Sequence, residues 1–247
     1  FTVILNNYMK SDDREILIRS RVERNKGIVR SILSDNYSII NNNDIMGVVN
    51  DMLKGNEDIK VSNFFLNDRI MHLRLVFIPT EERIINEDLK VDDTIMNGID
   101  IVNSEVGRSS LRIEPMIFRL VCANGLKAWR QDGENGVRLR HIHIDQDELY
   151  KLINEGVEKG LNTANKITNR YKESRKMILA NPVKEIYKIA EEEKLSKKMT
   201  DRIVKAYEIE PERNKYGVIN AFTRAARDLE GDRKLEMEKL AGKILAA

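Results

Sequence analysis

The chain has 247 residues, of which 42 are Lys or Arg and 40 are Asp or Glu, so the formal net charge is only +2. The hydrophobic share of 41% and the charged share of 33% are typical of a soluble globular protein. No apolar run approaches the roughly 20 residues that a membrane-spanning helix needs. The single Cys122 excludes an internal disulfide and a cysteine-based zinc cage and favours a cytoplasmic protein. Because the chain begins with Phe1 rather than Met, further residues are expected upstream.

The first 144 residues predict a β-rich region. Residues 15–24 alternate in twos, which is typical of a strand, and residues 28–33 resume the pattern after a turn at 25–27, so we expect a hairpin. One face of the first strand carries Ile16, Ile18 and Val22, and the other carries Leu17, Arg19, Arg21 and Glu23.

A helix and a second group of strands are expected next. Asn43 and Asp44 favour a helix over 44–54, and residues 60–66 and 70–78 flank a turn that predicts another hairpin. Residues 81–100 hold seven acids and two bases, which indicates a solvated acidic loop rather than a metal site. Further strands are predicted at 97–104, 110–123 and 137–144.

After Asp145 the apolar residues recur with the helical period. A long helix is predicted from there towards Ala180, and Pro182 begins the next one. The later helices are expected at 182–193, 199–208 and 215–230, with a final one after 231–232. The predicted fold is therefore α+β, with a β-rich region at 1–144 and a helical region at 145–247 packed on it as one integrated unit.

Candidate catalytic groups are few. His72 lies in an apolar strand, where a structural role is expected, and Cys122 lies in an apolar run, where a thiol is inert. His141 and His143 share one strand face, with Asp145 two residues further on, and this spacing leaves a metal site open as a minor alternative. The glycine-rich loops that hold phosphates are missing from the sequence. We expect no cofactor and no bound metal, and we assign no catalytic residue.

The clearest indication of function is the concentration of positive charge in two stretches of the sequence. Residues 16–30 carry five bases against one acid, and residues 108–140 carry seven bases against three acids. Guanidinium groups suit phosphate oxygens, while Trp129 and Tyr37 offer stacking faces for unpaired bases. On a strand, Arg108 and Arg112 would project from the same face. The alternative is that these arginines pair with the acids of 81–100. The candidate nucleic-acid-binding residues are Arg19, Arg21, Arg108, Arg112, Lys127, Trp129, Arg130, Arg138 and Arg140.

Four stretches carry a resemblance to a known family. Their sequences are NSEVGRSSLRIEP at 103–115, RLVCANG at 119–125, GIVRSILSDNY at 27–37 and YGVINAFTRAA at 216–226. In these stretches the chain resembles the phage- and plasmid-associated proteins grouped as "domain of unknown function 932". The resemblance implies a mobile-element context and no established activity, so it transfers no catalytic residue.

Three functions are compatible with these observations. The favoured hypothesis is a cofactor-free protein that binds or anneals single-stranded DNA on a basic β platform. We expect it to act as a homo-oligomeric ring or filament. We expect no membrane partner. The alternative is a non-enzymatic structural or protein-interaction factor of a phage or plasmid, such as an antagonist of host defence. A metal-dependent nuclease that uses His141, His143 and Asp145 is the third.

Overall fold

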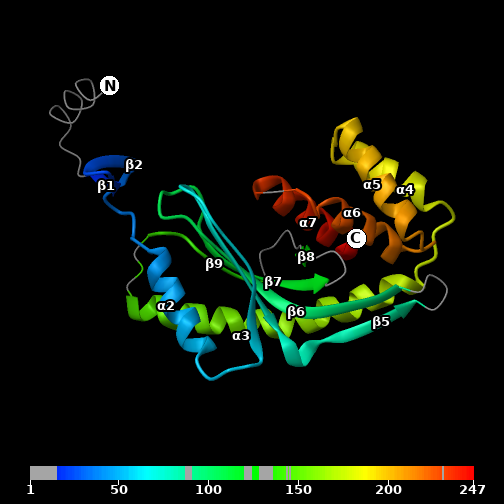
Figure 1. Cartoon of the computed structure of the whole chain (residues 1–247), viewed down its shortest axis with the longest axis horizontal. Coiled ribbons are helices and arrows are strands. Elements are labelled where there is room, and N and C mark those ends of the chain that lie inside the picture. Colours follow the sequence, from blue (N-terminus) through cyan, green and yellow to red (C-terminus); the bar gives the residue numbers. More distant parts are fainter. Residues whose placement is uncertain are drawn as a thin grey trace.

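The computed structural model describes residues 16–86, 91–119, 124–127, 136–142, 144, 146–229 and 231–247. Antiparallel strands fill the first half of the chain and helices dominate the second, so the predicted α+β class is confirmed (Figure 1). The strands are β1 (Ile16–Glu23), β2 (Lys26–Ser34), β3 (Ile59–Leu66), β4 (Met71–Phe77), β5 (Glu82–Asn86), β6 (Val91–Asn103), β7 (Leu111–Arg119), β8 (Asn124–Lys127) and β9 (Val137–Leu139). The helices are α2 (Asn42–Leu53), α3 (Gln146–Glu173), α4 (Pro182–Glu192), α5 (Lys197–Ile209), α6 (Lys215–Ala225) and α7 (Gly231–Ala246).

The main sheet is built around the long strand β6. Its order is β3-β4-β6-β7-β8 among the described strands, with β5 paired to β6 beyond the end of β4 and β9 paired to the start of β7. The prediction of an acidic loop over 81–100 is wrong, because residues 82–86 and 91–95 pair as antiparallel strands. The loop was predicted because acidic residues are usually exposed. Asp100, however, is fully buried on β6, where it accepts a hydrogen bond from Arg74 of β4.

One face of this sheet is apolar and is covered by α2 and α3. Leu73, Ile101 and Ile113 lie side by side on adjacent strands and are completely buried in this core. Two glycines let α3 come close to the sheet, since a Cβ atom at Gly160 would lie 2.6 Å from Cγ2 of Ile99, and one at Gly156 would lie 2.8 Å from Cδ1 of Ile113. The predicted long helix therefore packs along the sheet.

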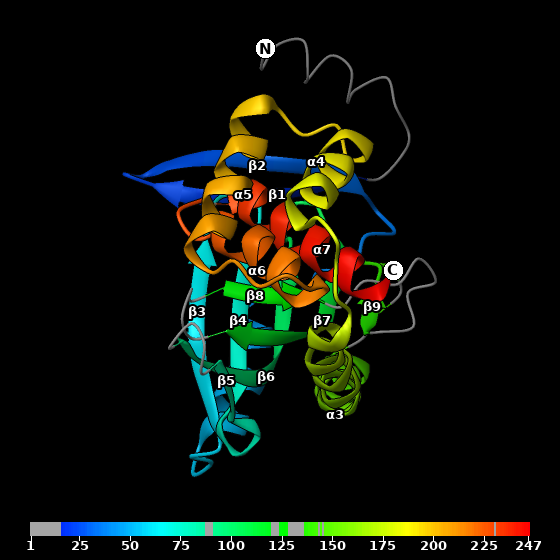
Figure 2. The same cartoon turned by 90° about the vertical axis from the view of Figure 1, so that its right-hand side faces the viewer.

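The opposite face is charged along part of its length. Arg74, Asp100 and Glu114 are direct neighbours across β4, β6 and β7, and α6 and α7 lie over this side of the strands (Figure 2). Helix α7 covers part of this face, where its Glu238 pairs with Arg74. Two cavities lie near the β3–β4 turn.

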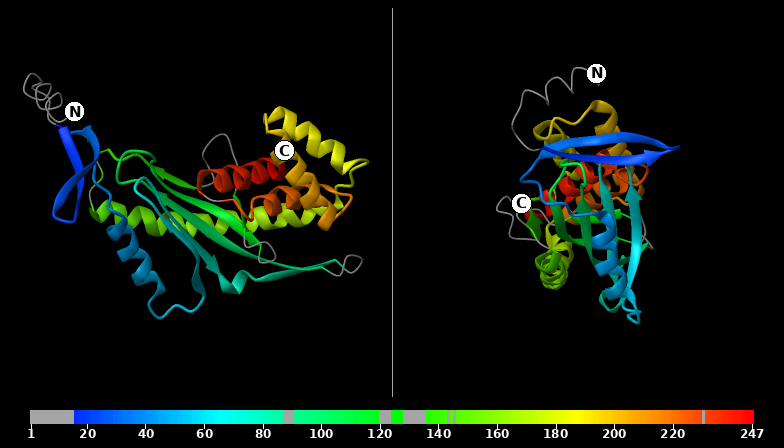
Figure 3. Two further views of the ribbon diagram at one scale, coloured as in Figure 1. Left: turned by 45° about the horizontal axis from the view of Figure 1, so that its top comes forward. Right: turned by 90° about the vertical axis from the view of Figure 1, so that its left-hand side faces the viewer.

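The hairpin of β1 and β2 forms a sheet of its own at one end of the molecule, away from α4 and α5 (Figure 3). Its predicted alternation is correct. The aliphatic face is turned to solvent and Arg19 is turned to the protein, whereas Arg21, further along the basic face, is 44% exposed. The side chain of Arg19 is 19% exposed, whereas Ile18 is 42% and Val22 is 80% exposed.

The helix ends follow local capping. The side chains of Asn181, Ser196 and Asn214 accept hydrogen bonds from the first turns of α4, α5 and α6. The long helix ends at Glu173 rather than near Ala180, and a short 3₁₀ turn follows it. Within the described part of the chain, no helix combines the length and apolar character needed to cross a membrane.

Candidate functional site

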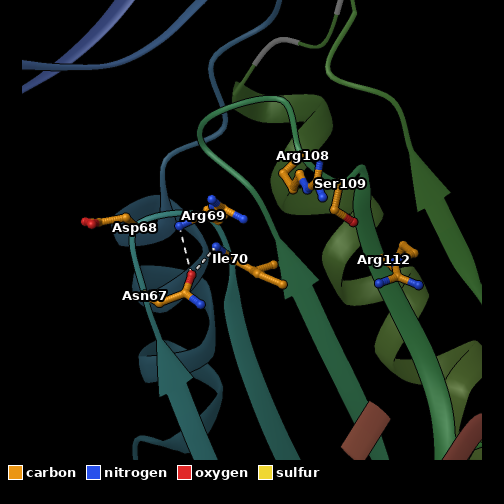
Figure 4. A pocket seen from close by; sticks show the side chains of 7 residues that line it. All are labelled: Asn67, Asp68, Arg69, Ile70, Arg108, Ser109 and Arg112. Carbon is orange, nitrogen blue, oxygen red and sulfur yellow. Dashed lines mark hydrogen bonds between the residues drawn. The ribbon is translucent and has the colours of Figure 1, made fainter. Parts of the chain in front are cut away.

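A cavity of about 460 Å³ lies between the β3–β4 turn and the segment that leads into β7. We call it the arginine pocket, because three of its lining residues are arginines (Figure 4). Arg69 comes from the turn, Arg108 from the loop before β7, and Arg112 from β7 itself. The described residues that line it are Asn67, Asp68, Arg69, Ile70, Arg108, Ser109 and Arg112.

Hydrogen bonds hold the two loops of this pocket together. The side-chain oxygen of Asn67 accepts from the backbone N–H groups of Arg69 and Ile70, both at 2.8 Å, which shapes the turn. The buried hydroxyl of Ser104 donates to the carbonyl of Arg69 at 2.7 Å and accepts from the N–H of Arg108 at 2.9 Å. A single side chain therefore sets the spacing between the two arginine-bearing loops.

The charge in the pocket is only partly compensated. Asp68 is the one acid among the described lining residues, and it already pairs with Arg21 of the hairpin. Among the described residues, no carboxylate lies within ion-pair distance of Arg69 or Arg108. Arg112 lies 3.3 Å from Glu114, and its buried Nε has no hydrogen-bond partner in the described part of the chain. Arginine donors without protein acceptors are suited to binding an anion.

A neighbouring lysine responds to this positive charge. Burial lowers the pKa of Lys239 on α7, and the charges of Arg112 and Arg138 lower it further, against the opposite effect of Glu114 and Glu236. Arg138 lies directly opposite Arg112 in the ladder of β9 and β7. Since cations repel one another, an anion bound beside Arg112 would relieve the unfavourable interactions.

The structure brings together some of the predicted binding residues. Arg108 and Arg112 line one pocket. Arg108 lies in the loop before β7, however, so the prediction that both project from one face of the same strand is wrong. Arg138 is held beside the pocket by a hydrogen bond of 3.1 Å from its Nε to Ser110, and Arg140 is exposed after β9. The backbone of Lys127 ends β8, whereas its side chain, Trp129 and Arg130 lie outside what the structure describes.

The two hairpin arginines serve other contacts. Arg19 donates to the side chain of Asn41 at 2.9 Å and lies 3.9 Å from Glu105. Arg21 pairs with Asp68 and with Glu23. Neither is among the described residues that line the arginine pocket, although Asp68, the partner of Arg21, does line it.

Tyr37 does not offer a free stacking face. Its ring is stacked on His141, with 4.8 Å between the ring centres, and its hydroxyl donates to the carbonyl of Ser104. Burial lowers the pKa of His141. Within the described residues, no three His, Cys, Asp or Glu side chains gather as a metal site would require; His143 and Asp145 lie outside those residues, as does Cys122.

Sequence reasoning missed Arg69 and the charged residues beneath α7. The predicted turn at 67–69 could have identified Arg69. A basic residue in a hairpin turn lies close to the loops that pack against that turn. Nothing in the local sequence pairs Arg74 with Glu238, which lie 164 positions apart and are hydrogen-bonded at 2.9 Å.

No curated protein and no solved structure matches the chain. A family model does match it, over residues 29–239. This range includes the arginine pocket, most of β2, all of β3 to β9 and most of the helical region. The chain therefore belongs to the family described as domain of unknown function (DUF932).

Proposed function

We propose that this protein binds single-stranded DNA, without a cofactor, through the arginine pocket and holds the strand for annealing. The observation that carries the proposal is the set of three arginines around one cavity, where the one acid among the described lining residues is engaged elsewhere. Guanidinium groups bind phosphate oxygens, and a groove of this kind follows a nucleic-acid backbone without reading its sequence. The resemblance to proteins of phages and plasmids makes a mobile element the proposed setting.

Self-association is part of this proposal. A single pocket contacts few phosphates, so repeated pockets in a ring or filament would multiply a modest affinity along the strand. The exposed aliphatic face of the hairpin is the surface that we assign to a second copy of the chain. It comprises Ile16, Ile18, Val22, Val29 and Ile32.

The same exposed face supports a second candidate function, a protein-interaction factor that does not touch DNA. Exposed apolar patches commonly mark protein contacts. The two functions differ in size-exclusion chromatography with a single-stranded oligonucleotide. A salt-sensitive shift to a larger assembly supports DNA binding, whereas indifference to the oligonucleotide favours the protein-interaction factor.

The decisive variant is Arg108→Ala with Arg112→Ala. Oligonucleotide affinity should fall, and the logarithmic salt dependence should flatten by about 0.7 for each phosphate contact that is lost. The matched control is Arg170→Ala with Lys205→Ala, which removes the same charge from exposed positions on α3 and α5. Fluorescence anisotropy at several salt concentrations measures both quantities, with the melting temperature as the check on folding.

Parent-like binding and an unchanged salt slope in the pocket variant would reject the proposal. Equal losses in the pocket variant and in the control would reject it as well, because the effect would then be one of net charge alone.

A further inference from the structure

A second cavity adjoins the arginine pocket. It has a volume of about 480 Å³ and lies between β3, β4 and the beginning of α7. The two cavities share Asn67 and Ile70 in their linings, so they meet at the β3–β4 turn. We call the second one the aromatic cavity, because Phe64 and Phe65 line it.

Charges near the floor of the aromatic cavity are already paired. Arg74 donates to Asp100 at 3.3 Å and to Glu238 at 2.9 Å, and His72 lies against the carboxylate of Asp100. Arg74, Asp100 and Glu238 are each no more than 1% exposed. Such a network is fixed by its own hydrogen bonds, and separating a buried pair would be costly. The floor is therefore unsuited to capturing a phosphate, in contrast with the arginine pocket.

Its walls combine apolar and amide groups with one lysine, Lys234 of α7. Phe65 lies opposite His72 in the β3–β4 ladder, on the side of the sheet that faces α7, and is 38% exposed. Val102 and Leu235 also line the cavity, as does the exposed Asn63. The oxygen of the Asn67 side chain is engaged in the turn, which leaves the amide nitrogen to donate. An aromatic face with nearby amides suits a flat, uncharged group that can form hydrogen bonds.

We propose that the aromatic cavity accepts one unstacked nucleobase of the DNA strand whose phosphates lie in the arginine pocket, with Phe65 stacking on that base. This inference rests on the proposed function. The shared turn places a phosphate site and a base site side by side, as a single strand requires. Stacking needs no particular base, because every base has a π face, so the cavity would bind without sequence preference.

The test compares Phe65→Ala with Tyr187→Ala, which removes an exposed aromatic ring from α4. The probe is a single-stranded oligothymidylate of about twelve nucleotides, and a second probe carries one 2-aminopurine. We expect Phe65→Ala to bind roughly ten-fold more weakly, as for the loss of one stacked base, with an unchanged salt slope because no phosphate contact is lost. The 2-aminopurine fluorescence should be quenched by the parent and by Tyr187→Ala but not by Phe65→Ala.

Two further variants separate stacking from packing. Phe65→Trp keeps an aromatic face and should retain quenching and affinity, whereas Phe65→Leu keeps apolar bulk and should lose both. Parent-like binding by Phe65→Ala, combined with weak binding by the Arg108 and Arg112 double variant, would overturn the base site and leave the proposed function standing. Parent-like binding by both variants would overturn the proposed function itself.

Discussion

Glu105 joins three segments that are distant in the sequence. Its carboxylate accepts from Arg30 of β2 at 2.7 Å and from the backbone N–H of Asn42 at the start of α2 at 2.9 Å, and Arg19 of β1 lies 3.9 Å away. The side chain is only 14% exposed, so solvent screens these contacts weakly. Glu105 thereby attaches the hairpin to the body of the protein and explains why Arg19 and Arg30 are turned inward.

Replacing this carboxylate should loosen the hairpin. We expect Glu105→Gln to lower the free energy of unfolding by about 2 kcal/mol at neutral pH, since hydrogen bonds to a charged group are lost. Urea denaturation measures the loss, and hydrogen exchange should localise it to β1 and β2. Asp51→Asn is the control, because it removes a carboxylate from an exposed pair with Lys54 and should change stability by less than about 0.5 kcal/mol.

The effect of Glu105→Gln should depend on pH. Burial opposes ionisation of Glu105, but the hydrogen bonds from Arg30 and Asn42 and the charges of Arg30 and Arg19 outweigh it and lower the pKa below 4.5. The folded carboxylate therefore binds a proton less readily than the unfolded one. Its contribution is complete above pH 4.5 and is lost as the pH falls through the folded pKa. A stability difference between parent and variant that persisted at still lower pH would contradict this account.

At the scale of elements, the β1–β2 hairpin is a separate two-stranded sheet with an exposed aliphatic face. Its strands pair with each other and with no other described strand, so both outer edges are open as well as the aliphatic face. Open edges and exposed aliphatic side chains are the features by which sheets associate. The ion pairs of Glu105 hold the opposite face, so the aliphatic face stays directed outward.

Charged substitutions on this face should dissociate the proposed assembly. We expect Ile18→Lys with Val29→Lys to shift the protein towards the monomer in light scattering, with little change in melting temperature, because both side chains are more than two-fifths exposed. Ile178→Lys with Ile209→Lys makes the same chemical change at exposed positions elsewhere and should leave the mass unchanged. A parent that is monomeric at all concentrations, with and without DNA, would refute hairpin-mediated association.

At the scale of the whole molecule, α3 and α7 connect the sheet with the helical region. Residues of α3 take part in both large cores: Ile153 packs with the sheet and α2, and Tyr171 packs with α6 and its neighbours. On the opposite face, Glu238 of α7 pairs with Arg74 of β4. A helix on each face therefore couples the two halves of the chain.

Loss of the buried pair should destabilise the whole molecule. We expect Glu238→Gln to reduce the free energy of unfolding by about 3 kcal/mol or more, because Arg74 would remain buried with part of its charge uncompensated. The control, Glu193→Gln, breaks a pair with Lys243 that is partly exposed and should cost less than about 1 kcal/mol. Urea unfolding followed by circular dichroism would check both values, and a similar cost in the two variants would contradict the special role of the buried pair.

The sequence by itself determined most of the elements, the pairing of β5 with the first part of β6 being an exception. Alternation in twos identified both hairpins, the helical period identified the long helix and its successors, and the change between these patterns near 145 indicated the α+β class. These features depend on residues that are close in the chain, so local periodicity suffices to detect them. The basic residues Arg108 and Arg112 could be selected in the same way, as part of a local excess of positive charge.

Only the tertiary structure decided which charges remain available. Arg19 and Arg74 are as basic as Arg108, yet the first contacts Asn41 and lies near Glu105, while the second pairs with Asp100 and Glu238. Segments far apart in the chain meet to form these contacts, and no local pattern encodes them. For the same reason Arg69 and Phe65 became site residues only once the β3–β4 turn was packed beside β7 and α7.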